Sequence, residues 1–159
     1  PVLGVITGLK NEAAFELSKR EHFNVVYSNF KNKTEAIEHI EQNNNIKPSE
    51  VLFIYDDVLD IPLAQKCGIS ILVKRFSNPL FIKYVKERKY ADYITGQTSG
   101  NNAIREACEL IMGIAESYEL ALDERIQFSQ KYQQYLQERD SIKCKYYYRA
   151  KDQLIETSY

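Results

Sequence analysis

The chain has 159 residues, of which 44% are hydrophobic and 27% are charged, and its 21 basic residues nearly balance its 22 acidic residues. This composition is typical of one globular domain, or of one domain with an arm. The chain lacks the electrostatic footprint of a dedicated nucleic-acid binder, and no apolar run approaches the roughly 18 residues that cross a bilayer. The three cysteines are far apart and match neither a zinc pattern nor a disulfide framework, so we expect a cytoplasmic protein. We interpret Cys67 and Cys108 as small buried apolar side chains.

The first residues form an apolar run at the very start of the chain. The sequence begins at Pro1 without Met, and its second residue already opens an expected strand. Natural domains seldom begin inside a buried strand. We therefore expect an N-terminal portion of the protein to precede this sequence.

Apolar runs alternate with helical patterns over the first 112 residues. We expect strands at residues 2–6, 23–27, 51–55, 69–73 and 93–94, and helices at 12–21, 34–42, 60–67, 80–89 and 102–112. Gly68 follows the third helix, where we expect a left-handed residue to end it. Strands that alternate with helices at this spacing predict an α/β fold with a parallel sheet covered on both faces.

The character of the chain changes after Gly113. Residues 114–159 contain no Gly or Pro, and we find no strand-like run in them. The apolar side chains Tyr118, Leu122, Ile126, Tyr132 and Leu136 fall near one helical stripe. We therefore predict a domain over residues 1–112, and a C-terminal helix with a polar tail over 113–159. The helix is expected to pack on its own domain or on a partner subunit.

Two strand ends in the first part of the chain carry groups that bind anions. Thr7-Gly8 follows the first strand, and its hydroxyl and nearby N–H groups are suited to a phosphate at a helix N-terminus. Lys33 begins the helix after the second strand, where a cation opposes the helix dipole unless an anion is bound. Each feature also has an ordinary interpretation, as a structural turn and as a solvated lysine.

A cluster of carboxylates follows the most apolar strand. Asp56, Asp57 and Asp60 come directly after residues 51–55. Like charges at one strand end repel, and a hard cation such as Mg²⁺ relieves this repulsion because it prefers oxygen ligands. The alternative is a set of exposed acids, with Asp60 as the N-cap of the following helix.

The order of these groups is more specific than any one of them. A hydroxyl, an ammonium and an acid cluster follow successive strands, which is typical of a site for phosphate and Mg²⁺. Phospho-receiver domains combine similar groups in the reverse order, and we reject that interpretation. Arg75 follows the next strand and is interpreted either as a substrate contact or as a solvated cation.

These motifs resemble those of the haloacid dehalogenase (HAD) superfamily of phosphotransferases. Within it, the chain is similar to the cap-less 3-deoxy-manno-octulosonate 8-phosphate phosphatase group. The likeness covers about residues 2–112 and is carried by Val5-Ile6-Thr7-Gly8, by Val26-Tyr27 with Lys33, by residues 50–68, and by residues 91–95 with 103–111.

The resemblance implies a Rossmann-like three-layer sandwich and Mg²⁺-dependent hydrolysis of a phosphomonoester. The implied substrate is a small phosphorylated metabolite such as a sugar phosphate, and the implied assembly is a homo-oligomer, a tetramer in that group. Thr7, Gly8 and Lys33 would bind the phosphoryl group, with Thr7 and Lys33 acting in catalysis. Asp56 would hold Mg²⁺ with Asp57 or Asp60 in support. We expect no membrane and no nucleic-acid partner.

The sequence departs from this group in its first motif. An Asp-x-Asp pair on the central strand supplies the nucleophile in the family, and these 159 residues contain no counterpart of that segment. Either the intact protein carries the pair outside this sequence, or the chain is a degenerate member that binds phosphate or assembles without turnover. We favour the first, because loss of a central strand leaves its neighbours with unpaired backbone groups.

Overall fold

A computed structural model describes residues 1–151 and 153–157, which form two compact units. Unit 1 comprises Pro1–Ala36 together with Leu122–Tyr159, and unit 2 comprises Ile37–Ala121. Within the described ranges, none of the helices has the length and apolar character needed to cross a membrane. The strands that precede the predicted site residues are thus divided between two units, each of which is described by itself.

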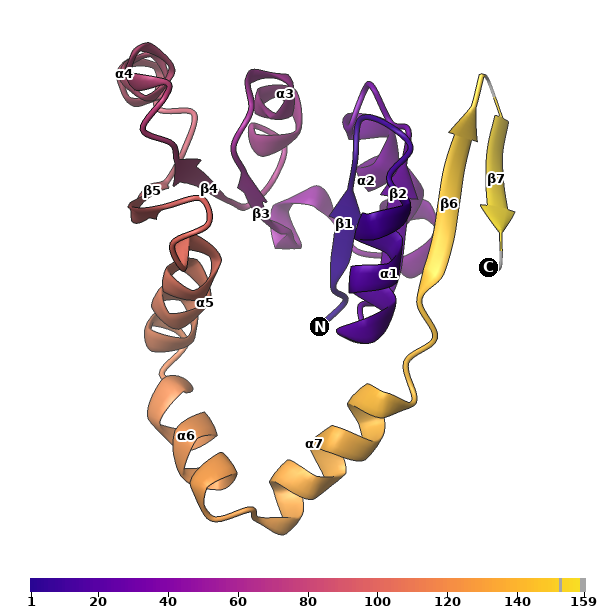
Figure 1. The fold of residues 1–159 in the computed structure, drawn as a ribbon, viewed down its shortest axis with the longest axis vertical. Coiled ribbons are helices and arrows are strands. Elements are labelled where there is room, and N and C mark those ends of the chain that lie inside the picture. Colours follow the sequence, from indigo (N-terminus) through magenta and orange to yellow (C-terminus); the bar gives the residue numbers. More distant parts are fainter. Residues whose placement is uncertain (152, 158–159) are drawn as a thin grey trace. The chain divides into compact units, whose positions relative to one another are not determined.

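Unit 1 contains a four-stranded sheet in the order β1-β2-β6-β7 (Figure 1). Its strands are β1 (Gly4–Ile6), β2 (Val25–Ser28), β6 (Lys145–Ala150) and β7 (Gln153–Thr157), and its helices include α1 (Glu12–Arg20) and α7 (Gln130–Asp140). Strand β2 pairs in parallel with β1 and with β6, whereas β6 and β7 are antiparallel. The carboxyl ends of β1, β2 and β6 therefore lie at one edge of this sheet.

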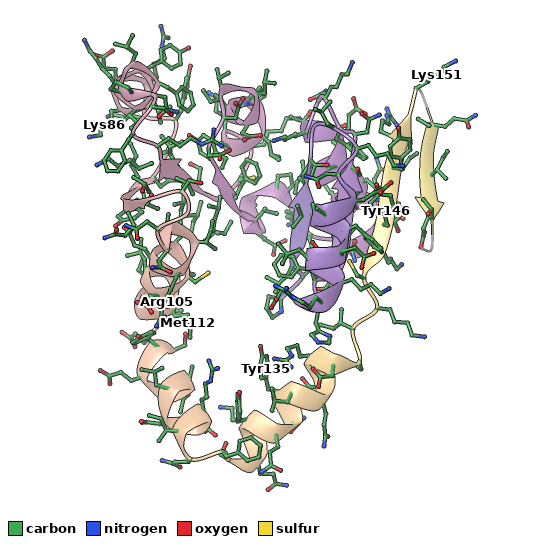
Figure 2. All side chains as sticks on the ribbon, in the orientation of Figure 1. Lys86, Arg105, Met112, Tyr135, Tyr146 and Lys151 are labelled. Carbon is green, nitrogen blue, oxygen red and sulfur yellow. The ribbon has the colours of Figure 1, made fainter. Side chains whose placement is uncertain are left out.

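Aromatic side chains from both ends of the chain form the core of unit 1. Tyr146 of β6, labelled in Figure 2, packs edge-on against Phe15 of α1 with their ring centroids 4.9 Å apart. Both rings, together with Val26 of β2, are buried. Burying such rings stabilises a unit by about 2 kcal/mol each, so β6 is an integral part of this core.

Unit 2 contains a three-stranded parallel sheet in the order β3-β4-β5. Its strands are β3 (Leu52–Tyr55), β4 (Ile69–Lys74) and β5 (Tyr93–Thr98), and its helices are α3 (Ile61–Ala64), α4 (Pro79–Arg88) and α5 (Ala103–Ile114). The core joins Tyr55 and Leu72 from the strands to Val85 of α4. Helices α2 (Thr34–Asn44) and α6 (Tyr118–Ile126) run across the two boundaries between the units. The predicted α/β fold with parallel strands and a helical extension is confirmed.

The C-terminal segment differs from the prediction in two respects. The helical extension is not one long helix but two, α6 and α7, and α7 begins where the Ser129 hydroxyl accepts a hydrogen bond from the Tyr132 N–H. The expected polar tail without strands is wrong, because residues 145–150 and 153–157 form β6 and β7. The boundary predicted after residue 112 stays a prediction.

Two local expectations in unit 2 are also wrong. Gly68 has no positive φ, and glycine is needed there for another reason: a Cβ at this position would lie 1.9 Å from the Ser49 carbonyl oxygen. Cys108, which we interpreted together with Cys67 as a buried apolar side chain, is exposed on α5, whereas Cys67 is half-buried.

Candidate functional site

Thr7 and Gly8 lie at the carboxyl end of β1, where the chain turns toward α1. The Thr7 N–H donates to the Tyr27 carbonyl oxygen at 2.8 Å, and the Phe30 N–H donates to the Thr7 carbonyl oxygen at 2.9 Å. The Thr7 hydroxyl is partly exposed and donates to the Leu9 carbonyl oxygen at 2.7 Å. The turn after β1 is therefore held against the segment that follows β2.

Lys33 directly precedes α2, at the same sheet edge as Thr7. Helix α2 begins at Thr34, whose N–H and hydroxyl both donate to the Asn32 side-chain oxygen, the hydroxyl at 2.8 Å. Because the Phe30 N–H bonds to the Thr7 carbonyl oxygen, only two residues separate that contact from Lys33. The structure thus brings the two phosphate-binding segments of the prediction together in unit 1.

A third segment, which contains Arg149, reaches this edge from the C-terminal part of the chain. The sequence did not predict this. Arg149 of β6 forms an ion pair with Glu35 of α2 at 2.6 Å. Its carbonyl oxygen accepts a hydrogen bond at 2.7 Å from the side chain of Asn29, a left-handed residue with φ 66°. A cavity of about 680 Å³ lies here, and the residues that line it are Asn29, Tyr148, Ala150, Lys151 and Gln153. The three consecutive tyrosines Tyr146, Tyr147 and Tyr148, a residue type enriched in strands, are the signal that could have identified the strand.

Asp56 lies directly beyond the carboxyl end of β3 in unit 2. The Arg75 guanidinium, just beyond the carboxyl end of the neighbouring strand β4, forms an ion pair with its carboxylate. Both side chains remain more than one third exposed to solvent, so the pair is screened by water and by salt. Asp56 is therefore a reachable carboxylate whose charge is already partly neutralised.

The other two acids of the predicted metal cluster have different surroundings. The Asp57 carboxylate accepts a hydrogen bond from the Leu59 N–H at 2.9 Å and caps the short 3₁₀ helix Val58–Asp60. Asp60 is 3% exposed and makes no capping hydrogen bond, so Asp57, rather than Asp60, has the capping role. The described part of the chain contains no group of three His, Cys, Asp or Glu side chains that could hold a metal ion.

Of these acids, Asp56 suits Mg²⁺ best. Mg²⁺ commonly binds through one or two carboxylates and keeps several of its waters, so a solvent-accessible aspartate at a strand end meets its needs. The roles of Asp57 and Asp60 as supporting acids stay predictions.

Tyr55 belongs to the core of unit 2 rather than to the site. Its side chain is 3% exposed, and its hydroxyl donates to the Tyr90 carbonyl oxygen at 2.8 Å. Burial, with a smaller effect from the charges of Asp60 and Asp92, raises the pKa of this phenol to about 12. The Tyr55 side chain is thus packed inward, against Leu72 of β4 and Val85 of α4.

Comparison with known proteins places the chain beside phosphatases. No family model matches it. Over 110 residues it is 29% identical to the 3-deoxy-D-manno-octulosonate 8-phosphate phosphatase KdsC of Escherichia coli K12, a match that covers 69% of this chain and 55% of KdsC. The chain therefore spans about half the length of the curated relatives that it matches.

Solved structures show the same fold. The Moraxella catarrhalis 3-deoxy-D-manno-octulosonate 8-phosphate phosphatase, solved with a magnesium ion, a phosphate ion and a KDO molecule, has a TM-score of 0.64 at 24% identity, with coverage of 77% of this chain and 66% of that one. A Legionella pneumophila protein described as a HAD superfamily (subfamily III A) hydrolase has a TM-score of 0.63 at 24% identity, with coverage of 79% and 65%.

These likenesses confirm the predicted Rossmann-like fold and the resemblance to the HAD superfamily. Within that superfamily, the similarity in sequence is to the 3-deoxy-D-manno-octulosonate 8-phosphate phosphatases, the group that the motifs indicated.

Proposed function

We propose that the protein is a Mg²⁺-dependent phosphomonoesterase that acts on a small phosphorylated metabolite, namely a sugar phosphate. The observation that carries this proposal is the hydrogen bond from the Phe30 N–H to the Thr7 carbonyl oxygen, which joins the Thr7-Gly8 turn to the segment that leads into Lys33 and α2. Support also comes from the curated relatives, which are phosphatases of a sugar phosphate, and from the magnesium and phosphate ions in a solved structure of the same fold.

In this proposal the residues of unit 1 bind the phosphoryl group. The Thr7 hydroxyl exchanges its hydrogen bond to the Leu9 carbonyl oxygen for one to a phosphoryl oxygen. The Lys33 ammonium offsets the negative charge that is spread over the phosphoryl oxygens in the transition state. Such stabilisation is largely electrostatic, so the positions of these donors matter more than their own reactivity.

In unit 2 the Asp56 carboxylate would hold Mg²⁺ after it separates from Arg75. The bound ion supplies charge neutralisation at the phosphoryl oxygens. The nucleophile implied by the resemblance is the first Asp of the Asp-x-Asp motif, which these 159 residues do not contain. The activity is accordingly proposed for the protein in which that segment is present.

The experiment is a phosphate-release assay over a panel of sugar phosphates, with a protein that carries the Asp-x-Asp segment. We expect Mg²⁺-dependent release, which Asp56→Asn abolishes and Lys33→Met lowers by about 100-fold or more. Asp140→Asn on α7 removes an equal charge far along the sequence and should leave the rate unchanged. Full activity in Asp56→Asn, or no turnover of any sugar phosphate, would contradict the proposal.

A second candidate function is assembly through the helical extension. Helices α6 and α7 contain no buried residue, and Ile126 and Phe128 are 79% and 58% exposed. Apolar side chains gathered in this way mark association surfaces. Deletion of everything after Gly113 cannot test this, because it also removes β6 from the sheet of unit 1.

Point substitutions in the intact chain test this second function. We expect Ile126→Ser combined with Phe128→Ser to lower the mass measured by light scattering, whereas Gln134→Ser on the exposed surface of α7 leaves it unchanged. An unaltered mass in the double variant argues against an assembling extension.

A further inference from the structure

A run of basic residues on β4 and α4 is not used by the proposed phosphatase site. Residues 74–89 contain six Lys or Arg and a single acid, Glu87, in a chain whose net charge is -1. Three of the six cations do not line the pocket described next: Arg75 pairs with Asp56, Lys83 pairs with Glu87, and Arg88 stacks over the Tyr84 ring. The other three are Lys74, Lys86 and Lys89.

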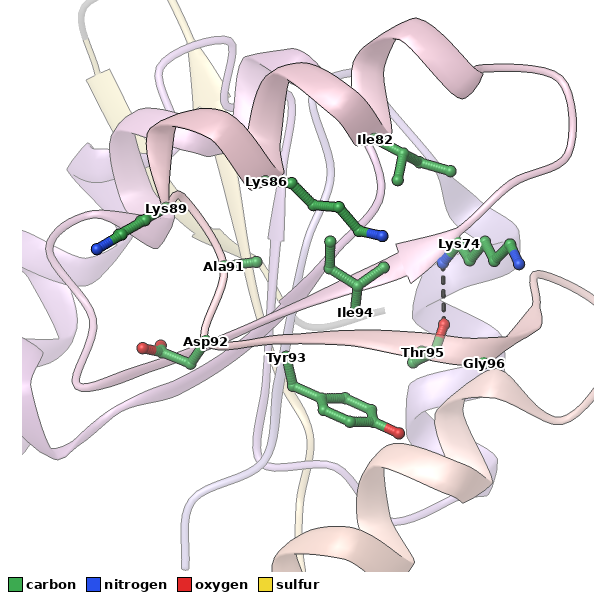
Figure 3. Close-up of a pocket in the computed structure, with 10 residues that line it drawn as sticks. All are labelled: Lys74, Ile82, Lys86, Lys89, Ala91, Asp92, Tyr93, Ile94, Thr95 and Gly96. Carbon is green, nitrogen blue, oxygen red and sulfur yellow. Dashed lines mark hydrogen bonds between the residues drawn. The ribbon is translucent and has the colours of Figure 1, made fainter.

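These three lysines line one pocket in unit 2. The pocket has a volume of about 500 Å³ and lies between α4 and β5. Figure 3 shows Lys86 pointing along the pocket from α4, with Lys89 at one end and Lys74 at the other. Among the residues that the structure describes, none of the three forms an ion pair with a carboxylate. Lys74 lies 5.8 Å from the centroid of the Phe76 ring.

The carboxylates near this pocket accept hydrogen bonds from other groups of unit 2. The Asp92 carboxylate, which also lines it, accepts hydrogen bonds from the Ser70 N–H at 2.7 Å and the Ser70 hydroxyl at 2.9 Å. The Tyr93 hydroxyl donates to Glu106, and that carboxylate also accepts from the Gly96 and Gln97 N–H groups. Neither carboxylate forms an ion pair with the three lysines, and Asp92 sets one negative charge against three positive charges in the lining, which keeps a net positive charge.

The rest of the lining is apolar. Ile82 of α4 and Ala91 and Ile94 beside and within β5 are half-buried and border the pocket. A surface that combines uncompensated cations with apolar side chains complements a small anion that has an apolar body. The volume lies within the range of roughly 300–1,000 Å³ that is typical of small-molecule sites.

We propose that the pocket between α4 and β5 binds a small organic anion through Lys86, assisted by Lys74, with Ile82, Ala91 and Ile94 against its apolar part; the Lys89 side chain points away from Lys86 (Figure 3) and adds only to the positive charge of the rim. The phosphoryl-binding residues Thr7 and Lys33 and the acids Asp56, Asp57 and Asp60 do not line this pocket. The site is an additional one, and its occupancy does not depend on the proposed hydrolysis.

Isothermal titration of the 159-residue chain with phenylphosphonate tests this site. The measurement is made in EDTA, and the probe has no phosphoester bond to cleave. We expect saturable binding that is tighter than that of methylphosphonate, because the ring covers the apolar lining. Lys86→Gln should weaken the binding by about tenfold, as expected for the loss of one charge-assisted hydrogen bond.

Two control variants separate this site from general charge and from the phosphoryl site. Lys83→Gln removes an equal charge from the same helix, but that lysine pairs with Glu87 outside the pocket, so binding should stay within about twofold. Lys33→Gln should likewise leave it intact. Absence of binding, equal losses in Lys83→Gln and Lys86→Gln, or a loss confined to Lys33→Gln would each overturn the proposal.

Discussion

The Arg75 guanidinium and the Asp56 carboxylate form an ion pair that joins the carboxyl ends of two neighbouring parallel strands, β4 and β3. Opposite charges at adjacent strand ends stabilise each other, and an arginine fork suits a carboxylate well. The same carboxylate is the proposed Mg²⁺ ligand. We therefore expect the Arg75 guanidinium and Mg²⁺ to compete for the Asp56 carboxylate.

The first prediction follows from this competition. We expect Arg75→Gln to tighten Mg²⁺ binding by about three- to tenfold, because the metal no longer displaces a guanidinium from an exposed pair worth up to about 1 kcal/mol. Titration calorimetry with Mg²⁺ measures the change. Arg88→Gln, which removes a guanidinium that stacks on Tyr84, is the matched control. Unchanged or weaker Mg²⁺ binding in Arg75→Gln would show that the two cations do not compete.

A second prediction concerns the close approach of Gly68 to the backbone of Ser49. Gly68→Ala should destabilise unit 2 by about 1 to 3 kcal/mol, because the added methyl group meets a carbonyl oxygen that cannot rotate away. Urea unfolding followed by circular dichroism gives the free energy. Gly113→Ala is the matched control: it lies in α5 with open space around it, and we expect a gain of about 0.5–1 kcal/mol. Similar effects of the two substitutions would contradict the tight contact.

The third prediction is a loss of stability at alkaline pH through Tyr55. The pKa of this phenol is about 12 in the folded protein against 10 as its ordinary value, so the unfolded chain releases the proton first. The contribution of Tyr55 is fully present below pH 10 and disappears as the pH rises toward 12. We expect Tyr55→Phe to flatten the decline of melting temperature over this interval. A decline as steep as that of the unaltered chain would assign it to other groups.

Cysteine reactivity provides the fourth prediction. Burial raises the pKa of the Cys67 thiol to about 11 and also raises the pKa of Cys144, whereas Cys108 is exposed on α5. Because the thiolate is the reactive form, iodoacetamide at pH 8 should modify Cys108 first and Cys67 last. Peptide mass spectrometry resolves the three sites. Early labelling of Cys67 in the folded chain would contradict the packing around it.

The first four strands were predictable because each contains a short apolar run bounded by polar or turn residues, such as 51–55 before Asp56. Of β5, only residues 93–94 were predicted, because the strand continues through the polar stretch up to Thr98. The strand at residues 145–150 was not recognised, because its aromatic run is only three residues long, with Lys145 and Arg149 on either side, and no Gly or Pro marks its ends. Its burial depends on the partner strand β2, far away in the sequence. Local periodicity in the sequence does not indicate a strand partner that is so distant along the chain.

The candidate site was predictable to a similar degree. Parallel strands share the edge at which they end, so Thr7 and Lys33 could be assigned to one edge from their positions after successive strands. The pairing of Arg75 with Asp56, and the arrival of Arg149 beside Glu35, depend on which strands are neighbours. Strand order is a property of tertiary structure, and a one-dimensional pattern specifies it poorly.

The pairing of β2 with β6 also governs how the protein is made. Val25 pairs with Lys145, so the sheet of unit 1 is complete only after β6 has emerged from the ribosome, whereas unit 2 is continuous in sequence. Unit 2 is therefore able to fold during translation, while β1 and β2 wait with apolar side chains uncovered. We therefore expect chaperones to bind the segment Pro1–Ala36 before β6 has been synthesised.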